Sequence, residues 1–493
     1  MKPVILGFDQ STQGTKVMLF DETGRPFYRA DKAHRQIIDE KGWVEHDPEE
    51  IWQTVLALTR QALRETNTDP AAIAAIGISN QRETAVAWSR STGKPVYNAI
   101  VWQCARGAAI CERMEREHPN APAIIRERTG LPLSPYFSAA KLAWVMENIH
   151  PDLNDLCCGT MDSFLVHRMT EGRDFRTDYS NASRTQLFNI RSLQWDADIC
   201  GMFGIPMKAL PTVTDSDGCF GETDLCGILP RKVPIHGVLG DSHAALFGQG
   251  CLNPGMMKAT YGTGSSIMMN VGEQPIFSAN GLVSSLAWKM GGKVNYVLEG
   301  NINYTGAVIT WMKDDLGLIS SPGETEQLAR EANPADTTYL VPAFSGLGAP
   351  YWKNDATACF IGMTRTTGRK ELVKAGLESI AYQITDIVEL MKKDAGVDSV
   401  ELRADGGPTK NGYLMQLQSD LLNAPVLVSK AEELSCIGAA WAAGIGMKIF
   451  DQHVFSRNGY AQYVPTMNDT ERKGRLEGWR RAGWQVVEAV SMT

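Results

Sequence analysis

Buried strands alternate with amphipathic helices along this chain, and this alternation limits its fold more than any other feature. The segment 73–79 (IAAIGIS) is almost wholly apolar, as expected of a strand covered on both faces. The segment 47–63 begins with Asp47 and Pro48, which are typical of a helix start, and its apolar residues then recur at helical spacing. The segment 377–396 repeats this spacing and ends in glycine, a common helix stop. Together these segments predict an α/β fold with helices layered against sheets.

Two short turns, 9–15 (DQSTQGT) and 260–266 (TYGTGSS), are rich in glycine and hydroxyl side chains, and each lies between apolar strand segments. They predict two β-hairpins, one near the start of each half of the chain. A turn without bulky side chains lets its backbone N–H groups reach a bound anion. The segment 405–411 (DGGPTKN), between a strand and a helix, offers a third such place. Because neither a GxxxxGK(S/T) nor a GxGxxG pattern occurs, we expect neither a P-loop nor a Rossmann dinucleotide site.

The length and charge of the chain indicate more than one domain and no nucleic-acid partner. At 493 residues the chain is too long for a single core. Glycine and proline gather at 248–254, where we expect the boundary between domains 1–250 and 251–493. A net charge of −8 argues against nucleic acid, and no apolar run is long enough for a membrane span. The ten cysteines lack metal-binding spacing, so we expect reduced thiols in a cytoplasmic protein.

Two aspartates directly follow apolar strands. Asp9 stands at the first hairpin turn, and Asp241 stands where a strand gives way to a helix in 238–250 (VLGDSHAALFGQG). A carboxylate beside a bound phosphate would be repelled unless a cation lay between them, and Mg²⁺ suits that place because it uses only one or two carboxylates. The alternative is that Asp9 only accepts hydrogen bonds from its own turn. With Lys16 across the hairpin as a candidate phosphate contact, we favour the nucleotide interpretation.

A cation and an acid, Arg82 and Glu83, directly follow the strand 73–79. Side by side, they can donate to and accept from the neighbouring hydroxyls of a polyol. The alternative is an ion pair on a solvated strand end, usually worth less than about 1 kcal/mol. Trp102 and Tyr136 combine an apolar face with a polar tip and can flank a small carbon chain, whereas the alternative places them in a core.

These residues stand within segments that resemble the FGGY family of carbohydrate kinases, and within it most of all the glycerol kinases. The similar segments keep the family's order and cover nearly the whole chain; VWQC (101–104), NASRT (181–185) and SGLGAPYW (345–352) are the more specific ones. The resemblance implies two actin-like (RNase H-like) domains that close over a cleft, with ATP and Mg²⁺ between them. It implies phosphoryl transfer from ATP to a hydroxyl of a small polyol or sugar, with Asp241 as the base that accepts the hydroxyl proton.

The resemblance also implies the other site residues. Asp9 matches the acid that organises Mg²⁺, and Lys16 stands in the first phosphate loop where glycerol kinases have arginine. The other phosphate and nucleotide matches are Thr12, Gln13 and Gly14 in the first loop, Thr263 in the second loop, and Gly306, Gly407 and Asn411; Thr310 stands at a further nucleotide-binding position. The substrate-binding matches are Arg82, Glu83, Trp102, Tyr136 and Asp241, and Ser242 and Ser266 stand at two further substrate-binding positions.

Three positions besides Lys16 depart from the glycerol kinase pattern. Ser242 replaces a glutamine and Ser266 a phenylalanine, and both changes remove volume from the substrate pocket; Thr310 replaces a glutamine beside the nucleotide. Losing an aromatic wall weakens the hold on a three-carbon substrate by about 1 kcal/mol or more and makes room for a longer one.

Three functions therefore remain open. We expect an ATP-dependent kinase whose acceptor is glycerol. The alternative is a kinase for a four- or five-carbon polyol or ketose, such as erythritol, erythrulose or xylulose. The third possibility, from a different class, is an actin-like protein that binds a nucleotide without turnover. We further expect a homo-oligomer, either a dimer or a tetramer.

Overall fold

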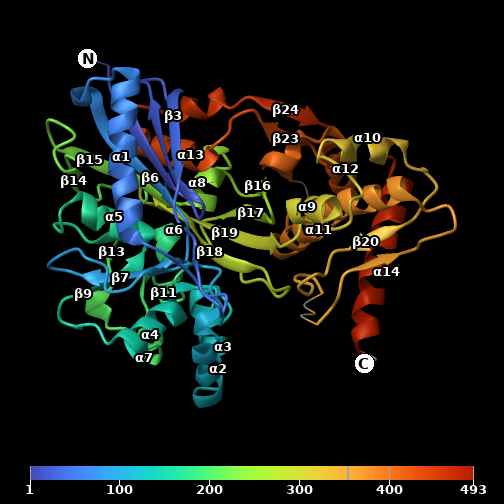
Figure 1. Cartoon of the computed structure of the whole chain (residues 1–493), viewed down its shortest axis with the longest axis horizontal. Coiled ribbons are helices and arrows are strands. Elements are labelled where there is room, and N and C mark those ends of the chain that lie inside the picture. The colour runs from blue at the N-terminus through green and yellow to red at the C-terminus, as the bar shows by residue number, and fades with distance from the viewer. Residues whose placement is uncertain (1, 352, 354, 399, 492–493) are drawn as a thin grey trace.

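The first half of the chain is built around a six-stranded mixed sheet with the order β14-β15-β6-β1-β2-β3 (Figure 1). The computed structural model describes residues 2–351, 353, 355–398 and 400–491, so Trp352, which ends one of the similar segments, lies outside the described residues. In this sheet β1 pairs antiparallel with β2 and parallel with β6, which pairs parallel with β15. The strands are β1 (Val4–Gln10), β2 (Gly14–Phe20), β3 (Pro26–Ala33), β6 (Ile73–Asn80), β14 (Glu222–Thr223) and β15 (Val233–Gly240).

Helices cover both faces of this sheet. On one face lies α1 (Pro48–Thr66), whose apolar residues pack against alternate residues of β1 and β2. The predicted start of this helix is confirmed, because the Asp47 side chain accepts a hydrogen bond from the backbone N–H of Glu49. On the other face lies α13 (Leu434–Gly446), which comes from the far end of the sequence.

A smaller sheet and a group of helices extend from the first half and form its lower part in Figure 1. The sheet has the order β4-β5-β8-β7-β9 and carries the loops that follow β6 and β8. Its strands are β4 (Ile37–Ile38), β5 (Val44–His46), β7 (Ala85–Ser89), β8 (Ala99–Ile100) and β9 (Leu156–Thr160). The helices are α2 (Ala108–Glu117), α3 (Ala121–Thr129) and α4 (Ser138–Ile149).

The second half repeats the core arrangement of the first in a seven-stranded sheet of order β18-β19-β17-β16-β22-β23-β24. Here β16 pairs antiparallel with β17 and parallel with β22, as β1 does with β2 and β6. Both predicted hairpins, β1–β2 and β16–β17, are therefore confirmed. The strands are β16 (Met256–Tyr261), β17 (Ser265–Gly272), β18 (Val283–Met290), β19 (Lys293–Ile302), β22 (Glu401–Asp405), β23 (Val426–Ser429) and β24 (Tyr460–Tyr463).

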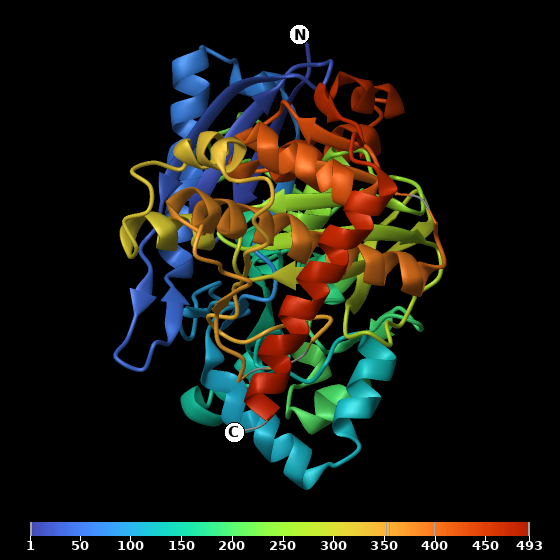
Figure 2. The same cartoon turned by 90° about the vertical axis from the view of Figure 1, so that its right-hand side faces the viewer.

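The long helix α11 (Arg369–Ala395) packs against this second sheet through one apolar face. Ile380, Ile384, Ile387 and Met391 are fully buried, and Gly396 ends the helix in the left-handed conformation at φ 64°, as its sequence predicted. The C-terminal helix α14 (Asp469–Ser491) lies across the side of the molecule that faces the viewer in Figure 2. It is held in place where Trp479 stacks on Tyr382 of α11.

The helix α13 links the two halves closely. The backbones meet where a Cβ on Gly438 would lie 1.9 Å from the carbonyl oxygen of Ala244, and one on Gly77 would lie 2.6 Å from that of Ala439. Only glycine permits such contacts. The chain passes from the first large sheet to the second near residue 250. Because α13 follows in the second half but packs on the first sheet, the boundary between 1–250 and 251–493 stays a prediction.

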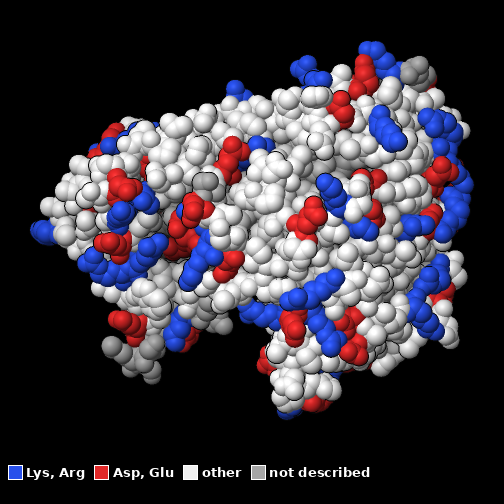
Figure 3. Space-filling model, turned by 180° about the vertical axis from the view of Figure 1, so that it is seen from behind, with Lys and Arg blue, Asp and Glu red and all other residues white. Residues whose placement is uncertain are grey.

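Figure 3, a view from behind, shows the molecule hollowed between its two halves at the lower edge, with basic and acidic side chains interspersed over that face. Among the residues that the structure describes, no helix is both long and apolar enough to cross a membrane.

Candidate active site

A cleft of about 770 Å³ opens between the two halves. From the first half it is lined by the turn after β1, the loop after β6, the segments around Trp102 and Tyr136, and the start of α8 (Asp241–Gly248). From the second half it is lined by the β16–β17 turn and the end of β19. Most sequence-predicted substrate and phosphate residues meet here, namely Thr12, Gln13, Arg82, Glu83, Trp102, Tyr136, Asp241, Ser242, Thr263 and Ser266.

Asp241 is the first residue of α8, directly after the end of β15. Its Oδ1 lies 3.2 Å from Nε of Arg82 and accepts a hydrogen bond from the backbone N–H of Ser242 at 2.6 Å. The close approach of Arg82 depends on Gly240, because a Cβ there would lie 2.6 Å from Cγ of Arg82. Burial raises the pKa of Asp241 and Arg82 partly opposes that rise. With 32 % of its side chain exposed, the carboxylate remains open to the cleft.

Arg82 and Glu83 form no ion pair on a solvated strand end, so that interpretation is wrong. The side chains of Arg82 and Glu83 are only 6 % and 2 % exposed. Arg82 donates from both terminal nitrogens to the carboxylate of Glu299 on β19, at 2.9 and 2.8 Å. Glu83 accepts from Nε of Arg184 at 2.6 Å, and Nη1 of Arg184 lies 2.9 Å from Glu299. Each member of the predicted pair is therefore held by a different, distant residue.

Glu299 and Arg184 are the site residues that sequence reasoning missed. Glu299 is fully desolvated; burial would raise its pKa, but Arg184 and Arg82 hold it well below the ordinary value. The sequence carried one signal for Glu299, which is the single acid in the apolar strand YVLEGNI (296–302). A buried charge requires a partner, so this acid indicated a charged residue elsewhere in the site. Arg184 belongs to the segment NASRT (181–185), which resembles the FGGY family, but the sequence indicated no role for this residue.

Trp102 and Tyr136 form one wall of the cleft, with ring centroids 5.4 Å apart. Nε1 of Trp102 donates to Oγ1 of Thr12 at 2.9 Å, which joins this wall to the turn after β1. Lys141 holds the loop of Tyr136 by donating to the carbonyl oxygens of Pro135 and Tyr136, each at 2.5 Å. Burial lowers the pKa of Lys141 to about 7.

The two serines that replace larger residues both line the cleft. Ser242 follows Asp241 on α8. Ser266 on β17 lies directly across from Asn301 on β19, so both side chains stand on the same face of this strand pair. The Ser266 hydroxyl approaches Oε1 of Glu299 at 3.4 Å. At both positions the wall of the cleft therefore consists of a small, polar side chain in place of a larger one.

The remaining residues of the first loop lie behind the cleft lining. Asp9 is 3 % exposed and accepts from the hydroxyl of Ser79 at 2.8 Å and from Nζ of Lys16 at 3.2 Å, neither of which belongs to its turn. Lys16 also pairs with Glu433 at 2.6 Å. Gly14 opens β2 where a Cβ would lie 2.6 Å from the carbonyl oxygen of Lys32, so it packs under β3. The predicted phosphate contacts of Lys16 and Gly14 stay predictions.

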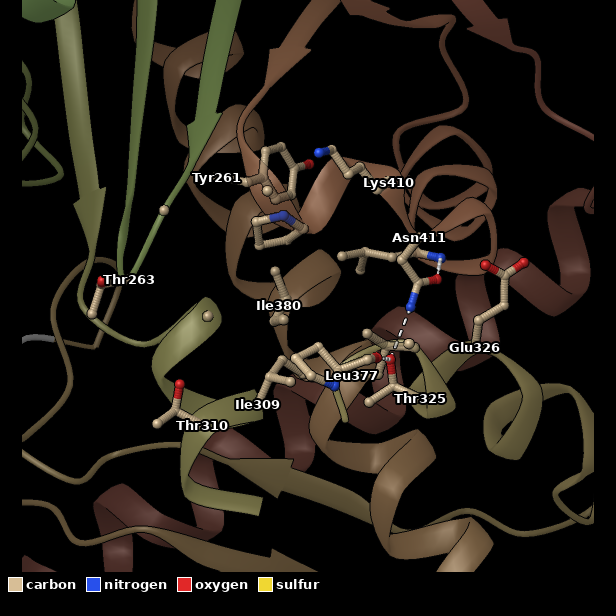
Figure 4. Close-up of a pocket in the computed structure, with 17 residues that line it drawn as sticks. Tyr261, Thr263, Ile309, Thr310, Thr325, Glu326, Leu377, Ile380, Lys410 and Asn411 are labelled. Atoms are coloured by element: carbon tan, nitrogen blue, oxygen red, sulfur yellow. Dashed lines mark hydrogen bonds between the residues drawn. The ribbon is translucent and has the colours of Figure 1, made fainter. Parts of the chain in front are cut away.

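A second cavity of about 680 Å³ lies in the second half beside this cleft (Figure 4). Its walls are the apolar side chains of Ile309, Leu377, Ile380 and Leu414 together with glycine-bearing turns. The sequence-predicted nucleotide residues Thr263, Gly306, Thr310, Gly407 and Asn411 all line it.

Asn411 and Gly407 fit this cavity in different ways. Asn411 caps α12 (Gly412–Leu422) by accepting from the backbone N–H of Leu414, and its amide donates to Oγ1 of Thr325 at 3.0 Å (Figure 4). Gly407 leaves open space where a Cβ would stand, so its backbone is accessible to a ligand. Gly262 and Thr263 line both cavities, so the two meet at the β16–β17 turn.

Comparisons with known proteins identify the family of the chain. Residues 4–248 match the N-terminal domain of the FGGY family of carbohydrate kinases, and residues 257–447 match its C-terminal domain. The chain is 46 % identical to glycerol kinase 1 of Thermotoga maritima over 97 % of this chain and 98 % of that protein. It is 42 % identical to the glycerol kinase of Alkaliphilus oremlandii over 98 % and 97 %.

Solved structures share the whole architecture. The glycerol kinase of Plasmodium falciparum with ADP matches with a TM-score of 0.93 at 35 % identity, over 98 % of each chain. A ligand-bound xylulose kinase of Lactobacillus acidophilus matches with a TM-score of 0.88 at 21 % identity, over 99 % of this chain and 98 % of that one, and shows the fold alone. The expected two-domain α/β fold is thus confirmed. The chain belongs to the FGGY family of carbohydrate kinases and is a phosphotransferase with an alcohol group as acceptor.

Proposed function

We propose that this protein transfers the terminal phosphoryl group of ATP to a hydroxyl of a small polyol, and that glycerol is its preferred acceptor. The observation that carries the proposal is the meeting of the two cavities at Gly262 and Thr263. A nucleotide whose base lies against the apolar walls of one cavity extends its phosphates across this turn into the other. Asp241 lines that second cavity, where the acceptor hydroxyl has to bind.

Asp241 acts as the general base in this proposal. Its carboxylate is partly exposed in the cleft and is oriented by Arg82 and by the backbone N–H of Ser242. Phosphoryl transfer depends mainly on alignment and charge stabilisation, so one positioned proton acceptor and a phosphate cradle suffice. The hydroxyl gives its proton to Asp241 as its oxygen attacks the terminal phosphorus in line with the departing ADP.

The phosphates would be held by the two glycine-bearing turns. Thr12 and Gln13 line the cleft from the first half and Thr263 from the second, so their hydroxyl, amide and backbone groups lie on both sides of the phosphate path. Asp9 stands at the end of β1, behind the first turn.

Mg²⁺ fits this donor set. Among the described residues no group of three or more histidine, cysteine, aspartate or glutamate side chains could hold a metal ion. Mg²⁺ needs none, because it binds through one or two carboxylates, water and the phosphates themselves. Asp9 would hold it, and bound there it would offset the charge that gathers on the phosphate oxygens.

Two serines favour a second candidate substrate. Ser242 and Ser266 leave the polyol end of the cleft open, and Asn301 adds an amide that can bind a further hydroxyl. A four- or five-carbon polyol or ketose, such as erythritol, erythrulose or xylulose, would use this space. The glycerol kinases at 42–46 % identity support glycerol instead, and we place it first.

Steady-state kinetics with ATP and a panel of glycerol, erythritol, erythrulose and xylulose test the proposal. We expect a phosphorylated product from glycerol with the highest kcat/KM. A higher kcat/KM for a longer acceptor would replace glycerol by that acceptor while keeping the kinase. ATP binding without product from any member of the panel would contradict the kinase and favour the non-catalytic nucleotide-binding protein.

The expected homo-oligomer and the expected cytoplasmic location stay predictions. Light scattering coupled to size-exclusion chromatography gives the first, and fractionation of the source cells gives the second.

A further inference from the structure

Five charged side chains of alternating sign form a continuous chain beneath the polyol end of the cleft. In order they are Asp241, Arg82, Glu299, Arg184 and Glu83, and the successive contacts measure 3.2, 2.8, 2.9 and 2.6 Å. The two ends of the chain, Asp241 and Glu83, both line the cleft. The middle member, Glu299, is fully buried and has no place in the cleft lining.

Glu299 alone among the five comes from the second half of the molecule. It stands on β19, where its neighbours on the same face are Ser266 and Asn301, which do line the cleft. Arg82 follows β6 of the first half, and Arg184 lies between α6 (Tyr179–Ala182) and β11 (Phe188–Asn189). The polyol end of the site is therefore completed only when the second half supplies this carboxylate.

The contacts of Glu299 determine how its partners face the substrate. Arg82 gives both terminal nitrogens to Glu299 as a fork, which leaves Nε as the nitrogen that contacts Asp241. Arg184 spans Glu299 and Glu83 and binds Oε1 of Glu83. Among the contacts of the described residues none occupies Oε2, which can accept from a substrate hydroxyl. A buried carboxylate between two guanidinium groups thus sets the direction of one donor and one acceptor.

We propose that Glu299 is the positioning residue for the polyol, fixing Arg82 directly and Glu83 through Arg184. This inference rests on the proposed function, because it assigns polyol binding to this cleft. Glu299 lines neither the cleft nor the second cavity, so it acts on the polyol through its partners. Its loss leaves two buried guanidinium groups facing each other, which lets Arg82 and Glu83 leave the geometry that binds hydroxyls.

The test compares Glu299→Gln and Arg184→Lys with the unchanged protein. The first variant keeps the shape and removes the charge; the second keeps the charge and removes the fork that spans Glu83 and Glu299. For both, we expect the KM of the best polyol of the panel to rise at least about tenfold, as for a broken buried charge pair. The KM of ATP stays within twofold, because the nucleotide cavity shares no residue of this chain of charges. Glu299→Asp, which keeps the charge on a shorter stem, should give an intermediate polyol KM.

A matched control comes from a buried pair elsewhere. Glu378 on α11 is 6 % exposed and pairs with Arg475 at 3.3 Å, so Glu378→Gln repeats the chemistry outside the cleft. We expect a lower melting temperature there and both KM values within twofold of the unchanged protein.

Two results would overturn the inference. One is a polyol KM within twofold of the unchanged protein in both variants; the other is a parallel rise of both KM values, which a general loss of structure produces. If Glu299→Gln fails to fold, Arg184→Lys decides alone by the same criteria. Absence of turnover by the unchanged protein would instead contradict the proposed function, and the inference with it.

Discussion

The cleft and the second cavity beside it, the proposed polyol end and nucleotide end of the site, are built on different principles. The polyol end draws its residues from both halves and places five linked charges in or beneath its wall. The nucleotide end is lined by residues between Tyr261 and Leu414 of the second half alone, with apolar side chains and glycine-bearing turns. A buried site of charged partners discriminates among hydroxyl patterns. An apolar slot with accessible backbone holds a flat base and a phosphate tail with little need of charge.

This difference predicts where substitutions are costly. Removing one member of a buried ion pair strands its partner and costs about 3–5 kcal/mol. Filling space in an apolar slot costs binding but leaves the fold intact. Substitutions at the polyol end should therefore alter chemistry and acceptor choice, and those at the nucleotide end should alter the KM of ATP alone.

The largest expected effect is that of Asp241→Asn. The amide keeps the shape of the side chain but cannot accept the hydroxyl proton, so kcat should fall at least about a hundredfold while both ligands still bind. Calorimetric titration with polyol and ATP checks binding, and a coupled assay checks turnover. Asp217→Asn is the matched control, because burial raises the pKa of Asp217 too but the residue lies outside both cavities; its kcat should stay within twofold. Near-normal turnover by Asp241→Asn would contradict the role of Asp241 as the general base.

The pH profile of kcat/KM sharpens the same point. Only ionised Asp241 can accept a proton, and its pKa is raised by burial. Activity should therefore be present at neutral pH and be lost, as pH falls, through a limb that lies above the ordinary aspartate value of 3.8. The acid limb should be absent from the residual activity of Asp241→Asn, and its persistence there would assign it to another group.

At the nucleotide end, Gly407→Leu should raise the KM of ATP at least about tenfold and leave the KM of the polyol unchanged. A side chain at Gly407 enters open space in the cavity, so it occupies volume that the nucleotide needs without a clash in the protein. Gly201→Leu is the control, since Gly201 also has open space but lies on α7 (Ala197–Met202), outside both cavities. An equal rise of both KM values in Gly407→Leu would contradict the separation of the two ends.

Ser266→Phe should shift acceptor choice by roughly five- to tenfold towards glycerol. An aromatic side chain across from Asn301 restores an apolar wall for three carbons and fills the space that a longer polyol needs. The ratio of kcat/KM for glycerol to that for erythritol measures the shift. An unchanged ratio would show that Ser266 does not set the length of the acceptor.

The smallest expected effect is that of Thr12→Val, which removes the hydrogen bond from Trp102 to the turn after β1. A hydrogen bond of this kind is worth about 1 kcal/mol, so the KM of the polyol should rise roughly fivefold. Thr12→Ser keeps the hydroxyl and serves as the control. Because Thr12 also lies on the proposed phosphate path, the KM of ATP should rise as well. An unchanged KM of the polyol would show that this hydrogen bond does not hold the Trp102 wall.

Local patterns predicted much of the fold. The helix start at Asp47, the helix stop at Gly396 and both hairpin turns follow from residues close together in sequence, where spacing and capping decide the structure. The return of α13 to the first sheet did not follow, because small residues such as Gly438 permit a close approach without naming their partner.

The site residues likewise divide into those that neighbouring residues in the sequence predict and those that only distant contacts bring together. Asp241, which lines the cleft, was predicted because a strand, an acid and a helix start are contiguous. The partner of Arg82 was not, since Glu299 stands 217 positions further along the chain. Contiguous motifs predict residues that line the cleft, whereas the residues that hold them in place are brought together only by the tertiary structure.

The most direct test is a crystal structure of the full chain with its best polyol and a non-hydrolysable ATP analogue. The account predicts one polyol hydroxyl at about 2.6–3.2 Å from the carboxylate of Asp241, with the terminal phosphate on the opposite side of that oxygen. A carboxylate turned away from the cleft, or a polyol whose hydroxyls all lie beyond its reach, would contradict it.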